Sequence, residues 1–156
     1  MAEAATARWH GDNYQARVFW ENALNLLDET SCVVEVAFEA NEPRAFDDVV
    51  VRYDPPVPRS GPDRIHADYH QVKYHVADGG HFGFLDFTDP AFIGATKVSL
   101  LERLKNAKAL VSAPSHFTFL TTHRVTPTDP LAPFISGNDR TLLLDCLLYT
   151  SPSPRD

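Results

Sequence analysis

The feature that most restricts the fold is a pair of apolar, β-branched segments separated by a proline-rich link. Residues 48–53 read DVVVRY, and residues 65–76 contain a second run in which apolar and polar side chains alternate. Such segments predict strands. The link, Asp54 to Asp63, carries four prolines, which lack the backbone N–H that strands and helices use. The sequence therefore predicts two neighbouring strands joined by an exposed loop.

The remaining segments complete an alternating helix and strand pattern. Apolar periodicity predicts two helices and two further strands, at residues 14–27, 97–110, 32–39 and 116–122. Gly11 to Asn13 is expected to supply the turn and cap of the first helix. Residues 81–94 read as irregular, and 131–135 as a short helix within a turn-rich connector. The order predicts an α/β fold, a mixed sheet whose first three strands meander and whose faces are covered by helices.

Polar side chains lie at positions where two of the expected strands can bring them together. Asp47 and Asp48 open the first segment, and Gln71 and Lys73 lie within the second. Alternation places Gln71 and Lys73 on one face and turns Val72 away. An acid entering the neighbouring strand can share a divalent ion with Gln71, and Lys73 can orient a metal-activated water toward a phosphate. The layout predicts a metal-dependent phosphodiesterase site.

Each of these residues also has an ordinary structural interpretation. Asp47 and Asp48 suit a turn that leads into a strand, and Gln71 and Lys73 suit the polar face of an edge strand. Their joint occurrence favours the catalytic hypothesis. Two alternatives stay open, a nuclease-like domain that binds nucleic acid or protein without cutting, and an α/β interaction domain with a solvated polar face. Convergence of the Asp48, Gln71 and Lys73 side chains on an open pocket would favour the catalytic hypothesis, whereas an interaction domain predicts side chains splayed over a flat, solvated surface.

Four segments in chain order carry a resemblance to a known family. They read GDNYQ, VEVAFEANEPRAFDDVVVRY, QVKYH and FLTTHRVTPTDPLAPFI. They resemble the PD-(D/E)XK nucleases, in the variant where Gln replaces the acid of the E-x-K element. More narrowly, they are similar to the N-terminal double-stranded-DNA endonuclease domain of effectors in cyclic-oligonucleotide antiphage (CBASS) systems. The resemblance spans about Gly11 to Asp145 and implies a restriction-endonuclease-like sheet flanked by helices.

The resemblance implies a role for each residue of the motif. The catalytic positions fall on Asp48, Gln71 and Lys73 of this sequence. Asp48, Gln71 and the backbone carbonyl of Val72 would hold Mg²⁺ or Mn²⁺, and Lys73 would position the attacking water. The implied activity is that of a magnesium-dependent endodeoxyribonuclease acting on double-stranded DNA.

Three further residues are candidates to support this site. A neutral Gln is a weaker magnesium ligand than a carboxylate, so Glu39 or Asp47 is a candidate to complete the metal shell. Glu39 is expected at the end of the first strand, on the face of Glu35, where a solvated strand end is the alternative. Gln15 matches a polar helix position that lies near the site in such nucleases, although an ordinary exposed helix residue fits equally.

The resemblance also implies a larger protein in the bacterial cytoplasm. A C-terminal sensor domain would bind a cyclic oligonucleotide, and activation would bring copies together as an oligomer. The nuclease domain is expected over residues 1–145 and incomplete at its C-terminal end. Residues 146–156, CLLYTSPSPRD, match the translation of a transposase adapter used in sequencing, and we expect them not to be native.

Composition restricts the partners and the compartment. The net charge of −7 counts against a protein that grips nucleic acid with its whole surface, but not against a nuclease whose metal ions act locally. Cys32 is the one cysteine outside residues 146–156, so the sequence predicts no disulfide framework and fits a reducing cytoplasm. No segment approaches the ~20 apolar residues of a membrane span.

Two other motifs are weak. His66, His70, His75 and His81 suggest zinc, but strand alternation turns His70 away from His75 and no H-E-x-x-H is present. The glycines at 79, 80 and 83 suggest a phosphate-binding loop, but the Gly-Lys-Ser/Thr of a P-loop does not follow. Neither motif competes with the predicted metal site.

Overall fold

A mixed four-stranded sheet organises the part of the chain that the computed structural model describes. The described residues are 2–41, 43, 46–59, 62–76 and 80–135. Within them the sheet order is β1-β2-β3-β5, with bounds Val33–Phe38, Val49–Pro58, Arg64–Lys73 and Ser115–Thr121. The first three strands are antiparallel neighbours, and β5 runs parallel to β3. The predicted α/β class and the meander are confirmed, whereas the expected domain end at 145 and the adapter-like residues 146–156 lie outside the described residues.

Helix α1, Ala2–Ala23, begins earlier than predicted and continues into a 3₁₀ helix, η1, Leu24–Leu27. The expectation that Gly11 to Asn13 precede the helix is wrong, because they lie inside it. Glycine costs a helix only about 1 kcal/mol relative to alanine, and the alanine-rich segment before it favours the helix. None of the helices in the described part of the chain combines the length and apolar composition that a bilayer crossing needs.

Helix α2, Leu100–Leu110, begins at a capping box. The Ser99 hydroxyl accepts a hydrogen bond from the Glu102 backbone N–H at 3.3 Å, and the Glu102 carboxylate accepts one from the Ser99 N–H at 2.8 Å. These two bonds satisfy backbone donors that the first helical turn leaves unpaired. The helix predicted for 97–110 is confirmed, and the cap sets its first residue.

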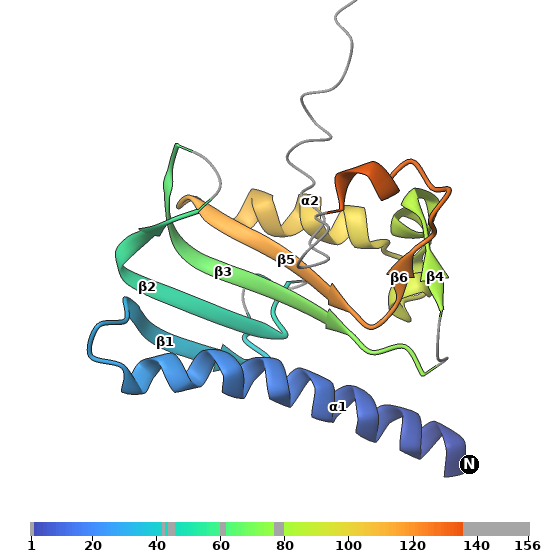
Figure 1. Cartoon of the computed structure of the whole chain (residues 1–156), viewed down its shortest axis with the longest axis horizontal. Coiled ribbons are helices and arrows are strands. Elements are labelled where there is room, and N and C mark those ends of the chain that lie inside the picture. The colour runs from blue at the N-terminus through green and yellow to red at the C-terminus, as the bar shows by residue number, and fades with distance from the viewer. Residues whose placement is uncertain (1, 42, 44–45, 60–61, 77–79, 136–156) are drawn as a thin grey trace, which may run out of the picture.

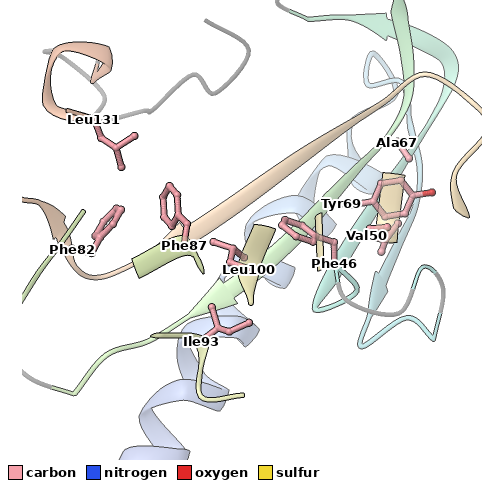
Figure 2. Close-up of a cluster of buried hydrophobic side chains, with 10 residues drawn as sticks. Phe46, Val50, Ala67, Tyr69, Phe82, Phe87, Ile93, Leu100 and Leu131 are labelled. Carbon is pink, nitrogen blue, oxygen red and sulfur yellow. The ribbon is translucent and has the colours of Figure 1, made fainter. Parts of the chain in front are cut away.

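The two helices cover opposite faces of the sheet, as Figure 1 shows. Alternation along the strands divides the core accordingly. On the α1 face, Val18 packs against buried valines of β2 and β3 (Val49, Val51 and Val72). On the α2 face, the buried side chains are Phe46, Val50, Ala67, Tyr69, Phe82, Phe87, Ile93, Leu100, Ala107 and Leu131. Figure 2 shows this second cluster, which extends from Ala67, Tyr69 and Val50 to Phe82 and Leu131.

The proline-rich link is partly strand, which corrects the loop predicted for residues 54–63. Arg52 pairs with Ala67 and Val57 pairs with Ile65, so β2 advances by five residues while β3 advances by two. The extra residues of β2 form a bulge that contains Pro55 and Pro56. A bulge removes the need for ladder N–H donors, so prolines are tolerated there.

Short elements replace the irregular segment predicted for 81–94. Strand β4, His81–Phe82, pairs in parallel with β6, Arg124–Val125. Two 3₁₀ helices follow β4, η2 over Phe84–Thr88 and η3 over Pro90–Ile93, and each buries one apolar side chain. The short helix expected at 131–135 is present as η4, Ala132–Phe134. These elements close the α2 face beside the end of β3.

A buried acid, Asp68, connects β2, β3 and β5 on the α1 face. The Tyr53 hydroxyl and the Arg59 guanidinium donate to one carboxylate oxygen of Asp68 at 2.7 and 2.8 Å. Nδ1 of His116 lies 3.5 Å from the other oxygen. Burial opposes ionisation of Asp68, but the nearby His116 and the hydrogen bonds from Arg59 and Tyr53 hold its pKa well below its usual range.

Replacing Asp68 with asparagine is expected to lower the free energy of unfolding at neutral pH by about 1–3 kcal/mol, because charged partners lose a buried acceptor. The folded-state pKa lies below the unfolded value, so Asp68 stabilises the fold above about pH 4 and loses this effect as pH falls further. Urea unfolding of wild type and Asp68→Asn at pH 7 and pH 3 checks this. A difference in unfolding free energy between the two proteins that is as large at pH 3 as at pH 7 would contradict this role of Asp68. Asp63→Asn, at an exposed site, serves as the control.

Candidate functional site

Asp48 and Gln71 meet where β2 begins and β3 approaches its end. Val49 pairs with His70, so the antiparallel register brings the preceding Asp48 opposite Gln71. The side-chain N–H of Gln71 donates to Oδ2 of Asp48, and the backbone N–H of Val72 donates to the same oxygen at 2.6 Å. Two of the three residues predicted to be catalytic are therefore in direct contact.

Negative charge is concentrated around Asp48, which is half-buried. Burial raises the pKa of Asp48 to about 6, and the charges of Asp47 and Glu39 act in the same direction. The Val72 N–H and the Arg103 guanidinium oppose the rise. A group whose ionised form is disfavoured by burial and by like charges gains stability from a bound cation.

Lys73, the third predicted residue, shares the sheet face of Gln71 because two residues separate them on β3. Its amine lies beside Gly94, where a Cβ added to the glycine would come within 2.9 Å of Nζ. Gly94 adopts a left-handed φ of 72° and ends η3. The glycine therefore both permits the turn and leaves space for the lysine side chain.

His75, two residues after Lys73, stacks on a second histidine. The rings of His75 and His123 stack with centroids 3.8 Å apart, and His75 also stacks on Phe92. Burial lowers the pKa of His75 to about 4, and the charges of His123 and Lys73 act in the same direction. His75 is therefore neutral at physiological pH and leaves the positive charge at this point to Lys73.

Backbone hydrogen bonds join the segment after β1, which contains Glu39, to Asp47 and Asp48. The backbone N–H of Glu39 donates to the Asp48 carbonyl at 3.0 Å, and that of Ala40 donates to the Asp47 carbonyl at 2.8 Å. Strand β1 ends at Phe38, and Glu39 has a left-handed φ of 46°. The expectation that Glu39 continues the strand face of Glu35 is therefore wrong. A non-glycine residue in this region stores strain, which is frequent at functional sites.

Gln15 connects α1 to the site. Its side-chain amide donates to the Asp48 carbonyl at 3.3 Å. The helix on the opposite sheet face therefore holds the backbone of Asp48 rather than its carboxylate. The structure places Gln15 beside the site, as the resemblance implied, in a position to fix the start of β2.

Arg103 is the neighbour that sequence reasoning missed. It lies on α2 and is half-buried, and its Nη1 donates to Oε1 of Gln71 at 3.2 Å. A signal was present, because Arg103 falls within the apolar stripe formed by Leu100, Leu104 and Ala107. A charged residue at such a position faces the core and needs a polar partner.

The donor set suits a hard divalent cation. In the part of the chain that the structure describes, no group of three or more His, Cys, Asp and Glu side chains is placed to hold a metal ion. A cation at Asp48 would therefore also need the Gln71 amide oxygen and the Val72 carbonyl, which are oxygen donors of the kind that Mg²⁺ and Mn²⁺ prefer. A shared cation would bring an Asp48 oxygen and the Gln71 amide oxygen together, whereas in the structure Gln71 presents its nitrogen to Asp48. Without a cation, two facing oxygens would repel.

Comparison with known proteins finds an extended similarity. The chain is 51% identical over 148 residues to CD-NTase-associated protein 4 of Enterobacter hormaechei subsp. hoffmannii (strain UCI 50). The alignment covers 94% of this chain and 30% of that protein, so the chain spans about three tenths of its relative's length. No family model matches the chain.

Proposed function

We propose that this chain is the catalytic domain of a divalent-metal-dependent endonuclease that hydrolyses double-stranded DNA as an effector of antiphage defence. The observation that carries the proposal is the contact between Asp48 and Gln71 on adjacent strands, with Lys73 on the same sheet face. The similarity to a protein named for its association with a CD-NTase supports a role beside such an enzyme.

The proposal gives each residue of the site a separate task. Asp48, Gln71 and the carbonyl of Val72 would hold Mg²⁺ or Mn²⁺, and the negative charge of Asp47 and Glu39 would strengthen this binding. The bound ion would supply Lewis-acid stabilisation of the phosphate and a more acidic water. The Val72 N–H keeps the Asp48 carboxylate in place, since it donates to Oδ2 at 2.6 Å.

Lys73 acts on the water and on the reacting phosphate. Its ammonium group orients the attacking water and offsets the negative charge that develops on the phosphate oxygens. The pKa of His75 is lowered to about 4, so this histidine is neutral and Lys73 supplies the positive charge beside the phosphate. Lys73 would therefore stabilise the transition state more than the bound substrate.

Regulation would lie in the longer protein. Following the resemblance, a sensor domain would bind a cyclic oligonucleotide and promote oligomerisation in the bacterial cytoplasm. The net charge of −7 fits this arrangement, since a chain with little general affinity for DNA depends on the cation and on activation to engage it.

The direct test is plasmid cleavage by the longer protein together with its activator, the proposed cyclic oligonucleotide. Cleavage is measured over a range of Mg²⁺ and Mn²⁺ concentrations. We expect nicked and linear products with either ion and none with EDTA, because the proposed site needs a cation to activate water. A parallel binding measurement completes the experiment. DNA binding without cleavage at every metal concentration would favour a nuclease-like domain that binds without cutting.

A further inference from the structure

The Gln71 amide is held at both ends by partners of opposite character. Its Nε2 donates to Oδ2 of Asp48, and its Oε1 accepts from Nη1 of Arg103 at 3.2 Å. Gln71 is buried, with 8% of its surface exposed. A carboxylate only accepts hydrogen bonds and a guanidinium only donates them, so these neighbours fix which end of the amide faces which residue.

This orientation is the wrong one for coordination. An amide binds a hard cation through its oxygen, so Gln71 must turn Oε1 toward Asp48 before it can act as a ligand. The turned amide would present its N–H groups to the Arg103 donors, which leaves buried donors unpaired. The positive charge of Arg103 also repels a cation beside Gln71. Hydrogen bonding and charge therefore favour the same, cation-free arrangement.

We propose that Arg103 is a positioning residue that holds Gln71 in a cation-excluding orientation until a phosphate group of the substrate takes its guanidinium. The inference rests on the proposed function for the role of Gln71 as a ligand and for the identity of the phosphate. A guanidinium matches phosphate geometry with two parallel hydrogen bonds, so a phosphate competes well with one amide oxygen. Release of Arg103 lets the amide turn, and cation and DNA then bind cooperatively. Without substrate, the site therefore binds cations only weakly.

The first test measures Mn²⁺ binding to the chain without DNA by isothermal titration calorimetry. Arg103→Gln removes the charge, and its amide can accept as well as donate, so we expect Mn²⁺ to bind about tenfold more tightly, a usual size for such coupling. Arg103→Lys keeps a positively charged side chain that only donates hydrogen bonds, so its Mn²⁺ affinity should stay close to that of wild type. Lys105→Gln removes the same charge from an exposed position of α2 and should leave the affinity unchanged.

The second test repeats the titration with a duplex that resists cleavage. Wild type should bind Mn²⁺ more tightly when the DNA duplex is present. Arg103→Gln should gain less affinity from the duplex, because its Gln71 amide is already free to turn. Circular dichroism checks each fold, and Arg103→Met provides a second neutral variant if Arg103→Gln does not fold. Unchanged or weaker Mn²⁺ binding by a folded neutral variant without DNA overturns the inference. Absence of DNA cleavage by wild type would instead overturn the proposed function, because the titration without DNA does not depend on cutting.

Discussion

Lys73→Ala is expected to reduce DNA cleavage by at least about a hundredfold, the usual cost of removing one group that stabilises a transition state. Lys73 shares the sheet face of Gln71, and its side chain lies beside Gly94. An alanine at position 73 is smaller than lysine, so it leaves space beside Gly94 and causes no clash. Its proposed contribution arises as charge develops on the phosphate, so turnover should fall more than DNA binding. The fold should persist because the lysine is only half-buried.

The assay for this variant is plasmid cleavage over a range of Mg²⁺ concentrations, with activator present and DNA binding measured in parallel. Raised Mg²⁺ should not restore cleavage, because the lysine is not a metal ligand. Lys108→Ala provides the matched control, since Lys108 is an exposed lysine in the last turn of α2. Undiminished cutting by Lys73→Ala would show that the active site has been misplaced.

Local pattern was sufficient to predict the sheet that carries the site. The β-branched run after Asp48 and the alternating run around Gln71 indicate strands, and period-two alternation then puts Gln71 and Lys73 on one face. The antiparallel meander brings Asp48 opposite Gln71. These contacts involve only neighbouring strands, so the alternation of apolar and polar residues is enough to predict them.

Contacts between distant elements were not predictable in this way. Arg103 meets Gln71 across 32 residues of sequence, and the meeting depends on how α2 packs on the sheet. The bulge at Pro55 and Pro56 depends on pairing with β3, which overrides the usual preference of proline for loops. Glu39 leaves the strand alternation at a left-handed residue, and no side-chain pattern marks that turn. In each case tertiary packing determines the geometry.

Asp48→Asn is expected to stabilise the cation-free fold while removing cation binding. Burial raises the pKa of Asp48 to about 6, so at neutral pH the protein holds an ionised group where the charged form is disfavoured. Asparagine has nearly the same shape and keeps an oxygen that can accept from Val72 and Gln71. The gain should be on the order of 1–2 kcal/mol in the free energy of unfolding, after allowance for solvent screening.

The pH dependence of this gain tests its cause. The folded-state pKa of Asp48, about 6, lies above the unfolded value of about 4, so wild type gains stability as pH falls through this window and loses it as pH rises. Asp48→Asn lacks this dependence, and its advantage in urea unfolding with EDTA should be full at pH 7.5 and small at pH 4. Mn²⁺ at a concentration high enough to occupy the site without DNA should stabilise wild type at pH 7.5 and leave the variant unchanged, because the variant lacks the carboxylate that holds the ion. A variant less stable than wild type at pH 7.5 would show that the carboxylate stabilises the cation-free fold. A more stable variant would instead fit a cation site at Asp48, because function is the usual reason that a protein retains a buried group at a cost in stability.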